Sequence, residues 1–160
     1  MHISHQIEAN IKVENVADTV TLDYEARFLR RKRLVSDSGG AFLVELPETR
    51  SLSATDGFVL DDGRIIAIHA KPEPIMKVRD VNLARIAWHI GNRHTPCQVK
   101  TDCLLIQEDH VLEHMLRLLG AEIEKLEAPF TPEGGAYGHG RTHSHEHSKS
   151  ELYINHAHHH

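Results

Sequence analysis

Residues 75–126 read IMKVRDVNLARIAWHIGNRHTPCQVKTDCLLIQEDHVLEHMLRLLGAEIEKL, and this stretch decides the fold. Apolar residues recur at the 3.6-residue period of an amphipathic helix around residues 83–90 and again around residues 111–119. Short apolar runs of strand length lie at 75–78, 97–99, 103–107 and 122–126. The resulting order βαββαβ predicts a ferredoxin-like domain, a two-layer α/β sandwich with an antiparallel sheet.

The ends of the two helices follow from capping residues. Asp80 is predicted to cap the first helix and Asp109 the second, because a short acidic side chain accepts hydrogen bonds from free N–H groups at a helix start. Gly91 with Asn92 stops the first helix, and Gly120 closes the second. The residues expected to face inward are Leu83, Ile86, Ala87 and Ile90 in the first helix, and Val111, Leu112, Met115, Leu116 and Leu119 in the second.

The residues before this stretch read as all-β. Val20, Leu22 and Tyr24 alternate with polar neighbours, as in a half-buried strand. A turn at 37–40 precedes an apolar strand that Pro47 is predicted to end, and residues 58–68 form a hairpin around Asp-Asp-Gly-Arg. Several short strands at this spacing predict a small sandwich or barrel.

The basic cluster of Arg27 and residues 30–33 is the one local departure from an acidic chain. We interpret it first as a solvated strand face and second as a docking patch for an acidic partner protein. The formal net charge of −5 argues against a nucleic-acid-binding protein.

The division of the chain follows a change of rhythm at Pro72, Glu73 and Pro74. We predict an N-terminal β domain at residues 1–73, a ferredoxin-like domain at 74–137 and a disordered histidine-rich tail at 138–160. No apolar run approaches the roughly 20 residues that cross a bilayer, and no signal peptide is visible. Two cysteines are too few to staple a secreted fold, so a cytoplasmic protein is expected.

Histidines crowd the end of the chain: eight of the fifteen fall in residues 139–160. A polar segment dense in imidazole is suited to binding nickel, copper or zinc. A purification tag is the alternative for His158, His159 and His160. The irregular stretch before them is interpreted as a natural metal-binding tail, with candidate ligands at His139, His143, His145 and His147.

Other candidate ligands lie within the predicted second domain. His94 is expected on a loop outside any apolar period, either as an exposed bystander or as a ligand. His110 and His114 are four residues apart, so one helix face could present both rings to a metal or simply to solvent. Cys97 and Cys103 lack metal-site spacing and are expected to be buried small hydrophobes. No motif for an activated serine, a nucleotide loop or a closed zinc-hydrolase site occurs.

The string WHIGNRHTPCQ at residues 88–98 resembles the G-N-R-H-x-P signature of the UreE family of urease accessory nickel chaperones. The similarity continues through residues 109–112 and 115–116 and through PFTPEGGAY at 129–137. Upstream, residues 78–79 and 31–33 also fit. Together the similar segments cover nearly all of residues 15–137, and a histidine-rich C-terminal tail is typical of many members.

The resemblance implies an N-terminal domain that binds a partner and a C-terminal domain that forms a homodimer and binds metal. His94 matches the signature histidine, which lies at the dimer interface so that two protomers share one ion. His110 matches an accessory histidine of some members, whereas Glu108 stands where certain relatives have another. The implied partners are the accessory GTPase UreG and the complex of apo-urease with its accessory proteins.

The histidines and the resemblance to the UreE family lead to three possible functions. The first is a homodimeric chaperone that delivers Ni²⁺ to urease, with Zn²⁺ or Cu²⁺ as further possible ions. The second is a metal buffer in which the tail holds the ions and the folded part is an anchor. The third, a metal-dependent hydrolase, needs a closed ligand set and a general base that the sequence lacks, so no enzyme is expected. Binding should weaken below about pH 6, where protons compete for imidazole.

Overall fold

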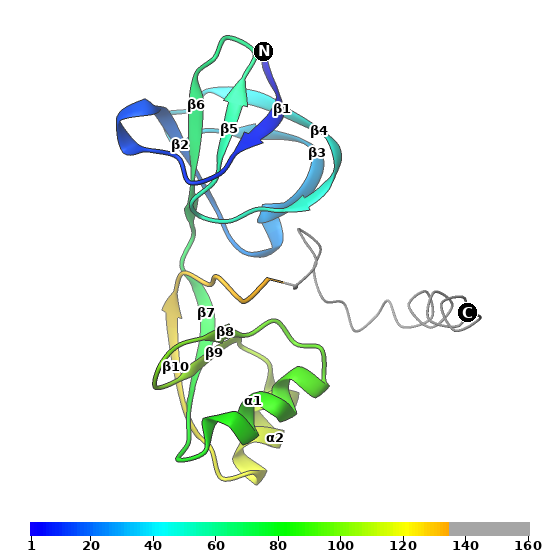
Figure 1. Cartoon of the computed structure of the whole chain (residues 1–160), viewed down its shortest axis with the longest axis vertical. Helices are drawn as coiled ribbons and strands as arrows, with labels where there is room; N and C mark the ends of the chain where they lie inside the picture. Colours follow the sequence, from blue (N-terminus) through cyan, green and yellow to red (C-terminus); the bar gives the residue numbers. More distant parts are fainter. Residues whose placement is uncertain (135–160) are drawn as a thin grey trace, which may run out of the picture.

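The computed structural model describes residues 1–134, which form an N-terminal all-β domain followed by a C-terminal α+β domain with two helices (Figure 1). The strands of the first domain are β1 (His2–Glu8), β2 (Val16–Leu22), β3 (Phe28–Val35), β4 (Ala41–Ser51), β5 (Gly57–Leu60) and β6 (Ile65–Ala70). Two short 3₁₀ turns, η1 (Val13–Asn15) and η2 (Glu25–Arg27), flank β2. The elements of the second domain are β7 (Glu73–Arg79), α1 (Leu83–Asn92), β8 (Gln98–Val99), β9 (Leu104–Gln107), α2 (His110–Leu118) and β10 (Glu122–Ala128).

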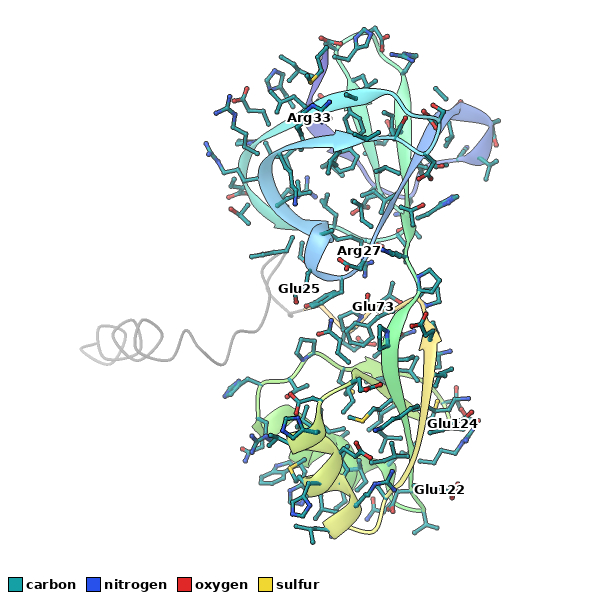
Figure 2. The ribbon with its side chains drawn as sticks, turned by 180° about the vertical axis from the view of Figure 1, so that it is seen from behind. Glu25, Arg27, Arg33, Glu73, Glu122 and Glu124 are labelled. Atoms are coloured by element: carbon teal, nitrogen blue, oxygen red, sulfur yellow. The ribbon has the colours of Figure 1, made fainter. Side chains whose placement is uncertain are left out.

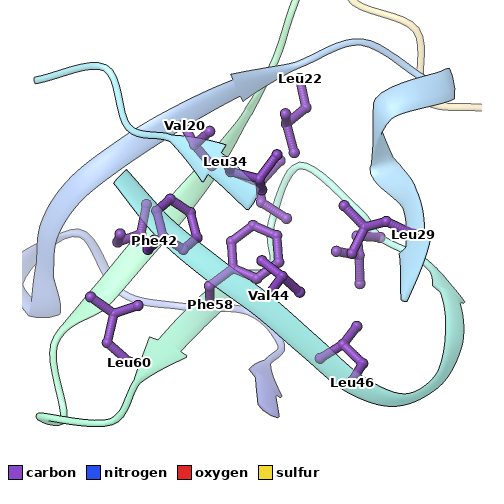
Figure 3. Close-up of a cluster of buried hydrophobic side chains, with 12 residues drawn as sticks. Val20, Leu22, Leu29, Leu34, Phe42, Val44, Leu46, Phe58 and Leu60 are labelled. Atoms are coloured by element: carbon purple, nitrogen blue, oxygen red, sulfur yellow. The ribbon is translucent and has the colours of Figure 1, made fainter. Parts of the chain in front are cut away.

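The N-terminal sheet has the order β2-β6-β5-β1-β4-β3 and curls around its own core. Two pairs, β1 with β4 and β2 with β6, are parallel, and the other neighbours are antiparallel. Figure 3 shows the interior, where the rings of Phe42 and Phe58 lie 5.6 Å apart, centroid to centroid. The predicted alternation is confirmed, because Val20 and Leu22 of β2 and Tyr24 just after it are all buried.

The predicted hairpin is confirmed as well, with β5 and β6 paired around a turn in which Gly63 adopts φ +89°. The prediction that Pro47 ends its strand is wrong, because β4 continues to Ser51. Its pairing with β3 shifts register between Arg31 opposite Glu45 and Leu29 opposite Arg50. Pro47 falls inside that irregularity, where no ladder hydrogen bond needs its missing N–H.

The C-terminal sheet has the order β10-β7-β9-β8, with antiparallel neighbours throughout. The element order β7-α1-β8-β9-α2-β10 is the predicted βαββαβ order. Both helices cover one face of this sheet (Figure 1). Its core comprises Met76, Val78, Ile86, Ile90, Leu104, Ile106, Leu112 and Leu116 with Ala121.

Two local predictions about the helices need correction. The cap of α1 is Asn82, whose side chain accepts from Arg85 N, whereas Asp80 accepts from Asn82 N and holds the preceding turn. Asp109 caps α2 as predicted, accepting from Val111 N at 2.8 Å and Leu112 N at 3.1 Å. Val111 itself is 51% exposed rather than inward, because it lies in the first turn, beyond the edge of the sheet-facing stripe.

A buried arginine joins the two domains. Arg27 was grouped with the solvated basic cluster, and that assignment is wrong: it is 1% exposed, whereas residues 30–33 are exposed on β3 as predicted. Its guanidinium donates to Leu22 O at 3.0 Å, to Leu52 O at 3.2 Å and to Phe130 O in the other domain. Burial lowers the pKa of Arg27, and the nearby carboxylates of Glu73 and Asp23 oppose that shift.

Glu73 completes this joint, at the point where the chain passes between the domains (Figure 2). Its carboxylate accepts from Tyr24 N at 2.9 Å and from Gln107 Nε2 at 3.0 Å. The ring of Tyr24 meets Phe130 edge to face, with the centroids 5.3 Å apart. Aromatic contact and satisfied polar groups therefore fix one domain against the other.

Candidate metal centre

His94 lies just beyond α1, whose position is fixed by the buried side chains of Ile86 and Ile90. It adopts the left-handed conformation with φ +57°, and its N–H donates to Gly91 O at 2.9 Å. The helix ends at Asn92, as predicted from Gly91 with Asn92, and His94 then turns the chain away. Histidine is among the residues that tolerate this conformation, and here it leaves the imidazole exposed at a structured turn.

His110 is the first residue of α2 and is exposed, as is His114 one turn later. The structure therefore places the two rings on one solvent-accessible helix at the predicted spacing. Glu113 of the same helix is engaged elsewhere, by Arg117 at 2.9 Å and Lys125 at 3.0 Å. Hydrogen bonds from Lys125 and Arg117 lower the pKa of Glu113. Its carboxylate is therefore engaged in surface ion pairs and is not paired with His110 or His114.

Within the described part of one chain, neither His94 nor the pair His110 and His114 belongs to a group of three or more possible metal ligands. In residues 1–134, the group of at least three His, Cys, Asp or Glu side chains with clustered ligand atoms is His2, Asp61 and Asp62, in the other domain. A site of three or more such ligands at His94 therefore needs donors from beyond Gly134 or from a second chain. The tail candidates His139, His143, His145 and His147 lie outside the described residues.

Two hydrogen bonds hold residues 131–133 against the segment that follows His94. Glu133 N donates to Cys97 O at 2.9 Å, and Thr131 N donates to Gln98 Oε1 at 3.0 Å. Cys97 follows His94 by three residues. The last described residues of the chain are therefore held against the segment that leads away from His94.

Cys97 sits between these two features but is a poor metal ligand. Burial, with a smaller contribution from the charge of Glu133, raises the pKa of its thiol from 9.0 to about 11. Metals bind the thiolate, which is scarce at neutral pH when the pKa is that high. The expectation that Cys97 and Cys103 pack as small apolar residues agrees with their half-buried and buried positions.

We expect Cys97 to react with iodoacetamide at pH 8 far more slowly than free cysteine. The reason is that a pKa of about 11 leaves roughly one thiol in a thousand ionised at that pH. Mass spectrometry of the folded protein from pH 7 to 11 measures the rate, and Cys97→Ser identifies the modified site. Rapid modification at pH 7 would show a thiolate and contradict this account.

Exposed apolar side chains lie on both helices. Trp88 of α1 is 63% exposed, and its ring meets His89 edge to face at 5.0 Å. Val81 before α1 and Leu118 at the end of α2 are also exposed. An exposed tryptophan on a helix is typical of a protein–protein contact surface. No helix within residues 1–134 is long and apolar enough to span a membrane.

Comparison with known proteins gives the same family for both domains. The model of the UreE urease accessory protein N-terminal domain matches residues 2–71, and that of the C-terminal domain matches residues 73–160. The urease accessory protein UreE of Rhodobacter capsulatus is 58% identical over 131 residues, covering 82% of this chain and 83% of its own. The UreE proteins of Ruegeria pomeroyi and Paracoccus denitrificans are 56% and 61% identical over 130 and 123 residues, covering 81% and 77% of this chain and 87% and 79% of theirs. The chain therefore belongs to the UreE family of urease accessory proteins.

Proposed function

We propose that the protein is a homodimeric nickel metallochaperone that binds Ni²⁺ at His94 and delivers it for maturation of the urease active site. The observation that carries the proposal is the pair of hydrogen bonds that hold residues 131–133 against residues 97–98, three to four positions after His94. Membership of a urease accessory family supports the same role. The proposed division is a partner-binding domain at 1–73, a ferredoxin-like metal and dimer domain at 74–137 and a metal-binding tail at 138–160.

The chemistry of this donor set suits transfer rather than storage. One His94 from each protomer supplies two imidazole nitrogens, and tail histidines or water fill the remaining positions of Ni²⁺. An incomplete protein shell lets a receiving protein add ligands before the old ones leave. Copper binds such nitrogen ligands more tightly than nickel, so selection of nickel must come from metal availability and from the docked partner. Zn²⁺ and Cu²⁺ are therefore expected to bind in vitro.

The dimer is proposed to form through the C-terminal domain, with the exposed Trp88 of α1 as an apolar anchor. A tryptophan side chain buries on the order of 150–250 Å², enough to dominate a small contact surface. His110, with His114 one turn away, is proposed as an accessory ligand pair. The proposed recipients are the GTPase UreG and the complex of apo-urease with its accessory proteins.

A metal buffer remains the second function, favoured by the eight histidines in residues 139–160. The two functions differ in what the tail does. For a chaperone, deleting residues 138–160 should lower the number of bound nickel ions and retain the one ion that two protomers share at His94. For a buffer, the same deletion should remove nearly all nickel and all contribution to urease activation.

The deciding measurement is equilibrium dialysis against Ni²⁺, paired with urease activity in cells grown on limiting nickel. The full-length chain, the chain ending at Tyr137 and full-length His94→Ala are compared. Retained binding with retained activation in the shortened chain supports the chaperone. A shortened chain that holds no nickel, with full activity in His94→Ala, would contradict it.

A further inference from the structure

Three metal-ligating side chains meet at the end of the N-terminal domain that lies away from the C-terminal domain (Figure 1). His2 Nδ1 lies 2.7 Å from Asp61 Oδ1, and His2 Nε2 lies 3.6 Å from Asp62 Oδ2. All three side chains are exposed, and one ligand atom from each lies within 4.8 Å of the others. Within residues 1–134, this is the group in which three possible metal ligands from one chain lie close together.

The backbone holds these groups in place from two distant segments. His2 begins β1, whereas Asp61 and Asp62 lie in the turn between β5 and β6. That turn is closed by Leu60 N donating to Arg64 O at 2.8 Å, and Asp61 N donates to Ile3 O at 2.9 Å. The three residues are thus held by paired strands of the N-terminal sheet.

The spacing fits a first-row divalent cation. Metal–ligand distances of about 2.1 Å place neighbouring ligand atoms of one ion roughly 3 Å apart. His2 Nδ1 and Asp61 Oδ1 are 2.7 Å apart and share a hydrogen bond, whose proton a bound cation would replace. Asp62 Oδ2 lies 3.6 Å from the other ring nitrogen, Nε2, so its side chain must rotate to share an ion with Asp61.

The charges around the cluster also favour a cation. Asp61 and Asp62 place two carboxylates beside one imidazole, a donor set that suits a divalent cation. Arg64 Nε lies 2.7 Å from Asp62 Oδ2 and would compete with a metal ion for that carboxylate. Its side chain is half exposed and can swing away, leaving Asp62 to the ion.

We propose that His2, Asp61 and Asp62 form a second metal site, separate from His94, which takes a divalent first-row transition metal such as Ni²⁺ through one imidazole nitrogen and two carboxylate oxygens. Water completes the coordination sphere. One nitrogen with two oxygens suits nickel, iron or manganese better than soft Cu⁺. The site lies in the other domain from α1 and His94, so it loads independently of the proposed dimer site (Figure 1).

The test is a Ni²⁺ titration of the full-length, ¹⁵N-labelled protein followed by the amide signals of residues 61–64. Paramagnetic nickel broadens signals of nuclei close to it, so these signals should vanish as the site fills. His2→Ala and Asp61→Asn should raise the nickel concentration for half-loss at least tenfold. His5→Ala is the matched control, because His5 is exposed on the same strand and binds only Glu45 O at 3.0 Å.

The outcomes separate this site from the other metal ligands of the chain. In His94→Ala the turn signals should broaden as in the native protein, so failure of the nickel-delivery proposal leaves this one standing. Signals that persist at nickel concentrations saturating the tail would overturn the proposal. Equal broadening in His2→Ala, Asp61→Asn and the native protein would also overturn it, since the nickel would then be held by other groups. Retained signal dispersion shows that each variant is folded.

Discussion

Replacing His94 with alanine is expected to abolish urease activation in cells grown on limiting nickel, while leaving the protein folded. His94 is exposed and its side chain is outside both domain cores, so its loss should remove a ligand and little packing. The left-handed backbone at this residue costs a non-glycine side chain about 1–2 kcal/mol. His94→Asn is therefore the better variant for stability, because asparagine tolerates that conformation and still lacks an imidazole.

The activity of urease in cell extracts, with and without added nickel, measures this effect. His69→Ala is the control, since His69 is exposed on β6 of the other domain and is not a proposed ligand. High external nickel should restore part of the activity by loading urease without a chaperone. Normal urease activity in both His94 variants under nickel limitation would remove His94 from the mechanism.

Arg27→Ala should destabilise the protein by about 3–5 kcal/mol, the usual effect of removing one partner from a buried charged network. Three carbonyl oxygens lose their donor, and the carboxylate of Glu73 loses the cation beside it. One of those carbonyls belongs to Phe130, so the loss falls on the contact between domains as well as on the first domain. The N-terminal and C-terminal domains should then adopt a wider range of relative orientations.

Urea denaturation followed by circular dichroism measures the change in free energy of unfolding. Arg33→Ala is the matched control: Arg33 is exposed on β3 of the same domain (Figure 2), and such surface changes stay within about 0.5 kcal/mol. Small-angle scattering of Arg27→Ala below its unfolding transition reports the spread of domain orientations. A loss below 1 kcal/mol with unchanged scattering would show that the joint does not depend on this arginine.

Local patterns were enough to predict the helices and the hairpin. The 3.6-residue period of residues 83–90 follows the stripe that packs on the sheet, and Gly63 supplies the positive φ of the β5–β6 turn. β1 could not be predicted from its sequence, because HISHQIE contains only two apolar residues, Ile3 and Ile7, and both are partly exposed. Its place between β5 and β4 comes from backbone pairing, which leaves little mark on composition.

Features that depend on contacts between distant residues could not be predicted from the sequence. Arg27 reads as one more surface cation beside residues 30–33, and only the fold brings Phe130 O to it across 103 positions. His2 and Asp61 are 59 positions apart in the sequence, so no local motif predicts their contact. The loop position of His94 could be predicted from Gly91 and Pro96, whereas its role as a ligand rests on the resemblance and remains a proposal. The link from Glu133 to Cys97 likewise carried no local signal.

The central claim is that two protomers share one nickel ion through His94. Its most direct test is a calorimetric nickel titration of a chain ending at Tyr137, compared with the same chain carrying His94→Ala. The account predicts a difference of one ion per two protomers, and ions held at His2, Asp61 and Asp62 stay equal in both titrations. Identical titrations of the two chains would contradict it.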